Sequence, residues 1–340
     1  MDIRQQITND IINAIEAGTP PWRQGWTSGL PHFNASTGQS YQGINQLLLA
    51  MQPYSDPRWL TYKQAEYMGL QVPKGARGTR IVKLVEVDRR RAKAAEARGG
   101  EVLVAEEQKA LMMKAYTVFN ACQIEGMAPM PDRTADVSTD EAVEAIIFGL
   151  QEEEGGRLKL NFGGNQPAYY PRTDEIRIPP ASQFQSLEDF HATLLHEAAH
   201  ATGHVKRLAR PHMDARFGSA EYGREELVAE LCAAFTLASI GLPPSPSCMA
   251  SHAAYISCWL EILRRDKQEI FRAAAQAQKA CDYLENTALK VQSKVAYNHV
   301  EELVSMENSS GLEDQINRAT VAPLPFLKRS SRFQDSSPVR

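Results

Sequence analysis

The chain has 340 residues, 43% hydrophobic and 23% charged, with a net charge of −4, values typical of a soluble globular protein of two domains with loose ends. Its five cysteines are odd in number, scattered and without a CxxC pair, which excludes a disulfide scaffold and predicts a reduced, cytoplasmic protein. The polar N-terminus and the lack of any apolar run of about 18 residues exclude a secretory signal and a membrane span, so no membrane partner is expected.

The first predicted element is an amphipathic helix, because isoleucines recur every four residues from Ile3 to Ile15. The Gly- and Pro-containing stretch 18–21 ends that pattern. Two short helices and two strands follow, expected at 45–51, 61–68, 79–87 and 116–120. Residues 88–114, between the strands, are charged and alanine-rich and indicate an excursion or a helical insertion. Together these elements predict a small α+β domain over residues 1–128.

Aromatic and basic side chains are interleaved along this first domain. Between residues 20 and 85 there are seven basic side chains and two acidic ones, a balance that suits a polyanion. Unpaired bases stack on Trp and Tyr at roughly 1–3 kcal/mol each, while Lys and Arg contact the phosphates. A helix rich in Arg, Lys and Asn, suited to the major groove of a duplex, is not apparent. An equally open alternative is that the aromatic residues form the domain's core. The candidates for single-stranded DNA are Trp22, Arg23, Trp26, Tyr41, Arg58, Trp59, Tyr62, Lys63, Lys74 and Arg77.

The Pro-rich stretch 126–132 predicts a linker, and a second domain is expected over residues 138–288. It begins with a predicted helix over 141–150 and a strand over 158–162. Residues 169–179 then predict a hairpin. An edge strand in this hairpin would bind an extended peptide by strand addition.

The most informative motif of the second domain is HExxH, formed by His196, Glu197 and His200. Two imidazoles four residues apart lie on one face of a helix and can bind the same metal ion, usually Zn²⁺. Glu197 is then the expected general base, which deprotonates a water molecule. Ser186 is a predicted N-cap, and Gly203 is a predicted left-handed residue that ends the helix. The alternative is a helix that carries two surface histidines.

A catalytic zinc site needs a third protein ligand, expected from the helix over 224–235. Glu226 and Glu230 share one face of that helix among apolar residues. We interpret Glu226 as the third ligand and Glu230 as the outer carboxylate that orients a ligand histidine, although the two roles could be exchanged. Glu225 is a weaker choice of ligand, and a solvated acidic face is the alternative. His204 follows Gly203, leaves the helical register and is expected to support the ligands from outside or to face the substrate.

Two further helices are predicted, at 250–265 and 267–286. His252, Tyr255 and Trp259 share a face of the first of these. Tyr255 or His252 could donate a hydrogen bond to the oxyanion of a tetrahedral intermediate, while packing in an aromatic core is the alternative for Tyr255 and the preferred interpretation for Trp259. The polar residues 289–340 predict a flexible tail.

These motifs, taken in order, resemble a known family over about residues 1–286. In the first domain the matching residues are Pro21-Trp22, Trp26, Asn34, Tyr41, Gly43-Ile44-Asn45, Trp59, Thr61, Gln64, Lys74-Gly75 and Val118-Phe119-Asn120. In the second they are Leu195-His196-Glu197, His200, Thr202-Gly203-His204, Arg207-Leu208, Glu225 to Glu230, His252, Tyr255-Ile256 and Trp259. The chain resembles the ArdC-type antirestriction proteins and the N-terminal regions of plasmid TraC-type primases.

The resemblance implies a single-stranded-DNA-binding domain followed by a mainly helical, zincin-like metallopeptidase domain. It adds Asn34, Asn45 and Gln64 to the expected DNA-binding residues. It also implies a protein of a plasmid or other mobile element, associated with conjugation, that shields incoming single strands from host restriction. The residues 289–340 have no clear counterpart in the family.

Two functions therefore compete. The first is a metallopeptidase, with zinc or another divalent metal, that single-stranded DNA brings to an unidentified protein substrate. The second is a non-enzymatic DNA-coating protein in which the zinc site is structural; it predicts that residues 1–130 alone bind single strands. A protease injected into a recipient cell as a toxin is a weaker third hypothesis, because no secretion signal supports it.

Overall fold

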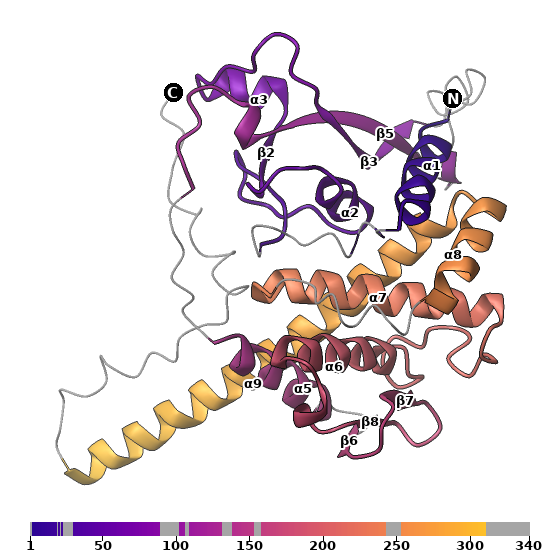
Figure 1. The fold of residues 1–340 in the computed structure, drawn as a ribbon. Helices are drawn as coiled ribbons and strands as arrows, with labels where there is room; N and C mark the ends of the chain where they lie inside the picture. The colour runs from indigo at the N-terminus through magenta and orange to yellow at the C-terminus, as the bar shows by residue number, and fades with distance from the viewer. Residues whose placement is uncertain are drawn as a thin grey trace. The chain divides into compact units, whose positions relative to one another are not determined.

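The protein is described by a computed structural model (Figure 1). Its description covers residues 2–18, 20, 22, 30–88, 102–105, 109–130, 138–152, 158–242 and 253–310. Contacts divide the chain into two compact units. Unit 1 combines Met1–Pro131 with Ala253–Ala275, and unit 2 combines Asp132–His252 with Gln276–Arg340. Each unit contains helices and a small sheet, so the fold class is α+β with two domains, as predicted.

Unit 1 is built around a five-stranded sheet. Its strands are β1 (Phe33–Asn34), β2 (Arg58–Leu60), β3 (Thr79–Asp88), β4 (Val102–Ala105) and β5 (Lys109–Asn120). The strand order is β1-β2-β5-β3, with β4 paired to β5 beside this path. Strands β1 and β2 are parallel, and the long β3–β5 ladder is antiparallel, from Thr79 opposite Val118 to Asp88 opposite Lys109. The expected helical insertion over 88–114 is wrong where the structure describes it, because 102–105 and 109–114 extend the sheet.

The helices of unit 1 form where the sequence supplies start signals. They are α1 (Ile3–Glu16), α2 (Ile44–Ala50), α3 (Tyr62–Tyr67) and α8 (Ala253–Arg265). The Asp2 carboxylate accepts from the backbone N–H of Arg4 and so caps α1, and Thr61 and Gln64 form a capping box at α3. The buried isoleucines of α1 are Ile7, Ile11, Ile12 and Ile15. One core cluster of the sheet contains Leu49, Trp59, Ile81 and Val118.

Helix α8 returns to unit 1 after the whole of the intervening domain. The rings of Trp22 and Trp259 pack edge to face with centroids 5.5 Å apart, and the Thr8 hydroxyl donates to the Lys267 carbonyl over 2.9 Å. The predicted continuous second domain, 138–288, therefore differs from the compact units, because 253–275 belongs to unit 1.

Helix α9 (Glu269–Ser310) is a single helix of 42 residues. The sequence predicted a helix that ended near residue 286 and a flexible tail from 289. That expectation is wrong for 289–310, which continues α9. The remainder of the expected tail, 311–340, lies outside the described residues.

Unit 2 surrounds its second helix, α6, with a small sheet and two other helices. The elements of unit 2 other than α9 are α5 (Thr139–Glu152), β6 (Lys159–Phe162), β7 (Ala168–Tyr170), β8 (Glu175–Ile178), α6 (Leu187–Thr202) and α7 (Ala220–Ile240). The strand order is β6-β8-β7, so β7 lies at an edge, and β7 and β8 form the predicted antiparallel hairpin. Helix α6 packs against α5, α7, β7 and β8. Within the described ranges, none of the helices combines the length and apolar character that crossing a bilayer would require.

Candidate metal centre and nucleic-acid surface

Helix α6 carries both histidines of the HExxH motif on one face. The Ser186 hydroxyl accepts from the backbone N–H of Asp189 over 3.2 Å and starts the helix. The Nε2 atoms of His196 and His200 lie 3.2 Å apart, with the two rings edge to face. Both rings thus direct the same nitrogen toward one point, which is the arrangement that a shared cation requires.

The carboxylate of Glu226, from the first turns of α7, lies opposite this pair of rings. Its Oε2 atom is 3.4 Å from His196 Nε2, and its Oε1 atom is 3.5 Å from His200 Nε2. One ligand atom from each of the three side chains lies within 4.8 Å of the others. Two imidazoles and one carboxylate form a donor set that suits a divalent metal and leaves a position for water. The structure therefore brings together the three residues predicted as ligands.

The outer nitrogens of the two histidines face two further carboxylates. Glu230 Oε1 lies 3.7 Å from His196 Nδ1, and Glu225 Oε1 lies 3.1 Å from His200 Nδ1. Each predicted histidine ligand therefore has its own outer acid. The sequence predicted this role for Glu230 but considered Glu225 only as a weaker choice of ligand.

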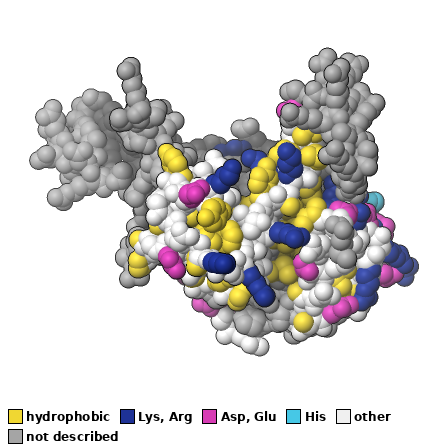
Figure 2. All heavy atoms as spheres, turned by 90° about the horizontal axis from the view of Figure 1, so that it is seen from above, with side chains coloured by type: hydrophobic (Ala, Val, Ile, Leu, Met, Phe, Trp, Pro, Cys, Tyr) yellow, Lys and Arg dark blue, Asp and Glu magenta, His cyan; other side chains and the backbone are white. Residues whose placement is uncertain are grey.

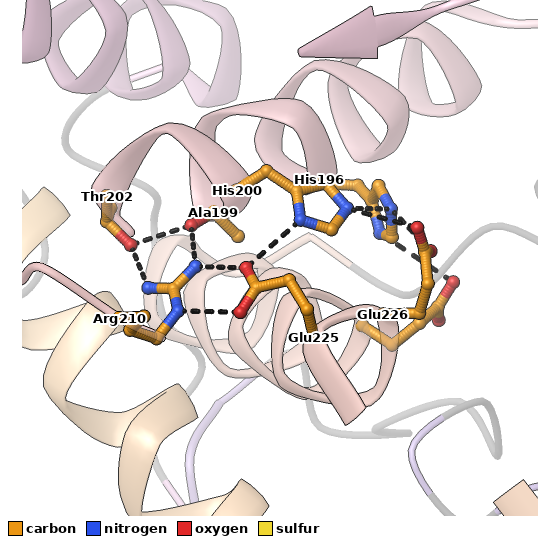
Figure 3. A network of polar contacts seen from close by, with 8 residues as sticks. His196, Ala199, His200, Thr202, Arg210, Glu225 and Glu226 are labelled. Atoms are coloured by element: carbon orange, nitrogen blue, oxygen red, sulfur yellow. Dashed lines mark hydrogen bonds and ion pairs between the residues drawn. The ribbon is translucent and has the colours of Figure 1, made fainter. Parts of the chain in front are cut away.

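Arg210, which the sequence analysis did not select, holds Glu225 in place (Figure 3). Its Nε atom donates to Glu225 Oε2 over 3.0 Å, and its Nη2 atom donates to Glu225 Oε1 over 2.5 Å. Burial alone would raise the pKa of Glu225, but the hydrogen bonds from Arg210 and His200 lower it below its ordinary value. Glu225 is thus an ionised, fixed acceptor.

The charges of the cluster favour a bound cation. Burial opposes protonation of the two rings, but the neighbouring carboxylates outweigh it and raise the pKa of His196, and that of His200 still further. Burial of Glu226 is likewise outweighed by the two imidazoles, which lower the pKa of its carboxyl. The cluster therefore stabilises positive charge at its centre.

Glu197 has the environment that a general base requires. It is buried, and this burial raises the pKa of its carboxyl above the ordinary value. The imidazoles of His196 and His200 and a hydrogen bond from the backbone of Tyr169 only partly offset that effect. A base with a raised pKa accepts a proton more readily near neutral pH.

His204 does not remain in the register of α6. Helix α6 ends at Thr202, as predicted, but Gly203 has φ −76° instead of the expected left-handed conformation. The backbone N–H of Lys206 donates to His204 Nδ1 over 3.3 Å, and the same nitrogen lies 3.9 Å from Asp174 Oδ2. These contacts connect His204 to the turn between β7 and β8; a supporting role for it at the metal centre stays a prediction.

Tyr255 lies in α8 and belongs to unit 1. Its ring stacks on Trp259 with centroids 6.1 Å apart. This contact is the aromatic packing expected as the alternative for Tyr255, and its oxyanion role stays a prediction. His252, the other candidate donor, lies outside the described residues.

Two of the tryptophans predicted to stack on DNA bases are buried. Trp22 is 1% exposed and Trp59 is 0% exposed, so a base has no access to either ring. Trp59 instead donates its indole N–H to His32 Nδ1 over 3.1 Å. The stacking role is therefore corrected to a core role for both residues, because a Trp ring buries more apolar area inside a small domain than almost any other side chain. Arg23 and Trp26 lie outside the described residues.

Three predicted DNA-binding residues form a network of their own. The Asn34 side-chain amide donates to Gln64 Oε1 over 3.1 Å and to the Tyr41 hydroxyl over 3.3 Å.

Asn45 has a structural partner, because its amide exchanges hydrogen bonds with the backbone of Val82 on the edge strand β3. A side chain that completes a sheet edge in this way is occupied, so the predicted DNA contact of Asn45 is corrected to a structural role.

The basic residues Lys63, Lys74 and Arg77 are exposed, as a phosphate-binding role requires. Exposed apolar side chains also lie on the same unit, at Tyr62 and Tyr67 on α3, at Met68 just after it, and at Leu84 and Tyr116 on the β3–β5 ladder. Figure 2, which views the molecule from above Figure 1, shows hydrophobic side chains interspersed with Lys and Arg. Tyr67 and Tyr116 were not among the candidates, because exposure of a tyrosine depends on the packing of its neighbours.

Comparisons with known proteins agree with this two-part architecture. Residues 1–119 match the N-terminal domain of anti-restriction factor ArdC, and residues 152–276 match a zincin-like metallopeptidase. DNA primase TraC of Escherichia coli is 34% identical over 95% of this chain, which spans only 31% of that primase. The uncharacterized protein y4eC of Sinorhizobium fredii is 34% identical over 83% of this chain and 91% of its own length.

Solved structures show the same similarity. The metal-free crystal structure of the antirestriction ArdC protein from plasmid R388 superposes with a TM-score of 0.68 at 33% identity and covers 85% of this chain and 99% of its own. The Mn(II)-bound structure of that protein gives a TM-score of 0.67 at 35% identity, with 85% and 98% covered.

Proposed function

The chain belongs to the ArdC-type antirestriction proteins, and from this premise we propose that it binds single-stranded DNA of a mobile element and acts on a protein with a metal-dependent peptidase centre. Protection of incoming plasmid DNA from restriction, in the cytoplasm of the recipient during conjugation, would be the outcome. Since the chain spans less than a third of the TraC primases that it matches, their activity as a whole is not carried over.

The observation that carries the enzymatic part is the grouping of His196, His200 and Glu226 beside the buried Glu197. The donor set fits zinc or another divalent ion, and the R388 relative is known with Mn(II). When bound, such an ion supplies Lewis acidity toward a carbonyl oxygen and a water molecule. The three side chains would hold the ion, and Glu225 and Glu230 would fix the outer nitrogens of the rings.

Glu197 would take the proton from the attacking water and pass it to the leaving amine. Burial favours its neutral form after the first transfer, so Glu197 would retain the proton until the leaving amine accepts it. The edge strand β7 would align an extended peptide, because one of its sides is not paired with any strand in the described ranges. The backbone of Tyr169, in that strand, also contacts Glu197, so the peptide and the base would meet there.

The DNA-binding part rests on exposed tyrosines and basic residues of unit 1. Tyr62, Tyr67 and Tyr116 would stack on unpaired bases, and Lys63, Lys74 and Arg77 would contact the phosphates. Stacking requires an open π-face, which a base in a duplex does not offer, so this surface favours single strands.

The second candidate function is DNA coating without catalysis, in which the metal only stabilises unit 2. The exposed aromatic and basic surface of unit 1 supports it, because such a surface could shield DNA without a peptidase. The position of Glu197 favours the enzyme. A structural metal site would need Glu226 as a ligand and Glu225 and Glu230 as partners of the histidines, but it would not need a further buried carboxylate beside them.

The deciding experiment is survival of incoming unmethylated DNA in a restricting host at matched protein levels. Wild type would be compared with Glu197→Gln, which removes the base but keeps the shape, and with Glu226→Ala, which removes a ligand. Loss of protection in both variants, with normal DNA binding, supports the peptidase. Full protection by Glu197→Gln would exclude the enzymatic proposal and leave DNA coating as the function.

A further inference from the structure

Arg210 is a buried arginine in the segment that connects α6 to α7. Its Nη1 atom donates to the Thr202 hydroxyl over 2.6 Å, and its Nη2 atom donates to the Ala199 carbonyl over 2.8 Å. The Nε and Nη2 atoms form the two hydrogen bonds to Glu225 described above. One guanidinium thus joins the last turn of the helix that carries both histidines to the first turns of the helix that carries Glu226 (Figure 3).

The contact between Arg210 and Glu225 affects the predicted ligand His200 through one oxygen atom of Glu225. Glu225 Oε1, which accepts from Arg210, also lies 3.1 Å from His200 Nδ1. A histidine that offers Nε2 to a metal carries its proton on Nδ1, and an acceptor beside Nδ1 fixes both that tautomer and the ring orientation. Glu225 can perform this task only if its own carboxylate is held still.

Arg210 also determines which of two adjacent acids can serve as a ligand. Glu225 and Glu226 are consecutive, and both are buried close to His200. The guanidinium occupies both oxygens of Glu225, with side-chain exposures of 3% for Arg210 and 9% for Glu225. A bidentate pair that water does not reach is held in one geometry, so Glu225 stays outside the ligand set.

Gly203 supplies an independent observation for the same arrangement. A Cβ atom at this position would meet the Met213 sulfur first, and it would lie 2.8 Å from Arg210 Nη2 and 2.9 Å from Arg210 Cζ. The backbone of Gly203, at φ −76°, would accept any residue. The glycine is therefore favoured by space and not by conformation: it leaves room for the side chains of Met213 and Arg210 beside the end of α6.

We propose that Arg210 is a positioning residue of the metal centre, which holds Glu225 so that Glu225 orients His200, and that Gly203 provides the space in which the guanidinium lies. The inference rests on the proposed metal centre. In the described residues Arg210 contacts Glu225, Thr202 and Ala199 but not His196, His200 or Glu226, so its action on the metal is indirect.

The test is Mn²⁺ and Zn²⁺ affinity of the full-length protein, measured by isothermal titration calorimetry, together with the metal-induced rise in Tm. The main variant is the double substitution Arg210→Leu with Glu225→Leu, because removing both partners leaves no unpaired buried charge. We expect roughly 10- to 100-fold weaker metal binding and a smaller metal-induced rise in Tm, with a metal-free Tm near that of wild type. Arg210→Lys keeps the positive charge but loses the bidentate geometry of the guanidinium. Its metal affinity should therefore lie between those of wild type and the double variant.

Unit 2 offers a matched control in Arg207 and Asp174. This pair is also bidentate, at 2.8 and 2.9 Å, and Arg207 is as buried as Arg210, but neither residue contacts His196, His200 or Glu226 in the described part of the unit. Asp174 has φ +49°, which asparagine tolerates, so the control is Arg207→Leu with Asp174→Asn. Its metal affinity should equal that of wild type.

The outcomes separate the two proposals. If wild type binds neither metal, the proposed metal centre fails. If wild type binds and the Arg210/Glu225 double variant binds equally well, or loses no more affinity than the Arg207/Asp174 control, the positioning role of Arg210 is overturned. Should the double variant not fold, Gly203→Ala in a Met213→Ala background removes no polar group, and the new Cβ would displace the guanidinium, with Met213→Ala alone as the control. Equal affinity in these two folded variants would then contradict the inference.

Discussion

At the residue scale, His32 shows how unit 1 satisfies a buried polar ring. It is 4% exposed, accepts the indole N–H of Trp59 at Nδ1 and donates to the carbonyl of Pro57. Both ring nitrogens therefore have partners, and the Trp59 N–H requires that Nδ1 carry no proton, so the imidazole is neutral. Burial lowers the pKa of His32 to about 4, against an ordinary value of 6.5.

This shift predicts a loss of stability in mild acid. The unfolded chain takes up a proton at His32 as the pH falls below 6.5, while the folded chain resists protonation until about pH 4. The contribution of His32 to the free energy of unfolding is therefore fully present above pH 6.5. It decreases by up to about 3 kcal/mol as the pH falls toward 4. Denaturant unfolding of wild type and His32→Gln between pH 7 and 4.5 measures the effect. Equal pH slopes in the two proteins would refute this role of His32.

Glu226 and Glu230 test which of the two acids in α7 is the ligand. Glu226 lies near the Nε2 atoms of both rings, whereas Glu230 lies near the outer Nδ1 of His196 only. We expect Glu226→Ala to abolish stoichiometric metal binding and Glu230→Ala to weaken it roughly 10- to 100-fold. Metal content after dialysis and titration calorimetry distinguish the two. The reverse ranking would exchange the roles.

At the residue scale, the structure brings together residues whose sequence signal was local. The spacing of His196 and His200 predicted that both lie on one face of a helix, and Glu226 of the next helix lies beside them. Arg210 was missed because it lies in an irregular segment, and its partners are 8 to 15 residues away with no periodicity to connect them. Trp59 was misassigned because sequence alone does not show whether an aromatic ring faces the core or the solvent.

At the element scale, α5 and α9 approach each other closely at Gly149. A Cβ at this position would lie 2.6 Å from the Thr287 carbonyl carbon and 2.7 Å from the Ala288 nitrogen, both backbone atoms. Gly→Ala inside an exposed helix usually stabilises by about 1 kcal/mol. Here we expect Gly149→Ala to destabilise unit 2 by about 1–3 kcal/mol, because two helix backbones must move apart.

Thermal unfolding of Gly149→Ala checks this expectation. Phe148→Ala is the matched control, since Phe148 is the neighbouring position on α5 and is 49% exposed. The control should change stability little. A Gly149→Ala protein as stable as wild type would show that α9 does not pack on α5 at this distance.

The surface elements of unit 1 give a second prediction. Tyr67 on α3 and Tyr116 on β5 are 91% and 40% exposed, whereas Trp59 on β2 is buried. We expect Tyr67→Ala and Tyr116→Ala to weaken single-stranded DNA binding by about 1–3 kcal/mol each without loss of stability. Trp59→Ala should instead lower Tm. Fluorescence anisotropy with a short oligonucleotide, and with its duplex as control, measures both effects. Unchanged affinity in both tyrosine variants would remove this surface as the binding site.

Elements with complete local signals were predicted, and elements that depend on partners were not. Helices α1 and α6 have caps and apolar periodicity within their own residues. Strand β4 and the start of β5 lie in an alanine-rich, charged stretch whose local composition favours helix, and their pairing across the ladder outweighs that preference. The left-handed end expected at Gly203 was wrong, because its φ is −76°; what favours glycine there is the space that Met213 and Arg210 occupy.

At the scale of the whole molecule, unit 1 is discontinuous in sequence. Helix α8 begins more than a hundred residues after the last strand of the sheet in the sequence, yet Trp259 is 0% exposed and packs on Trp22 of the N-terminal segment. Lys267 also accepts from Thr8 on α1. Unit 1 is therefore complete only when the chain has returned from unit 2.

This discontinuity changes what a fragment experiment should show. The DNA-coating hypothesis predicted that residues 1–130 alone bind single strands, but residues 1–131 lack α8 and would expose Trp22 and the α1 face that α8 covers. Exposing one buried Trp weakens folding by about 3 kcal/mol, a large share of a small domain's stability. We therefore expect 1–131 to melt well below a second fragment in which a Gly/Ser linker joins 253–275 to it. Circular dichroism and DNA affinity compare the two, with Trp259→Ala in the joined fragment as control. If 1–131 is as stable and binds DNA as tightly as the joined fragment, α8 contributes nothing to the folding or the DNA affinity of unit 1.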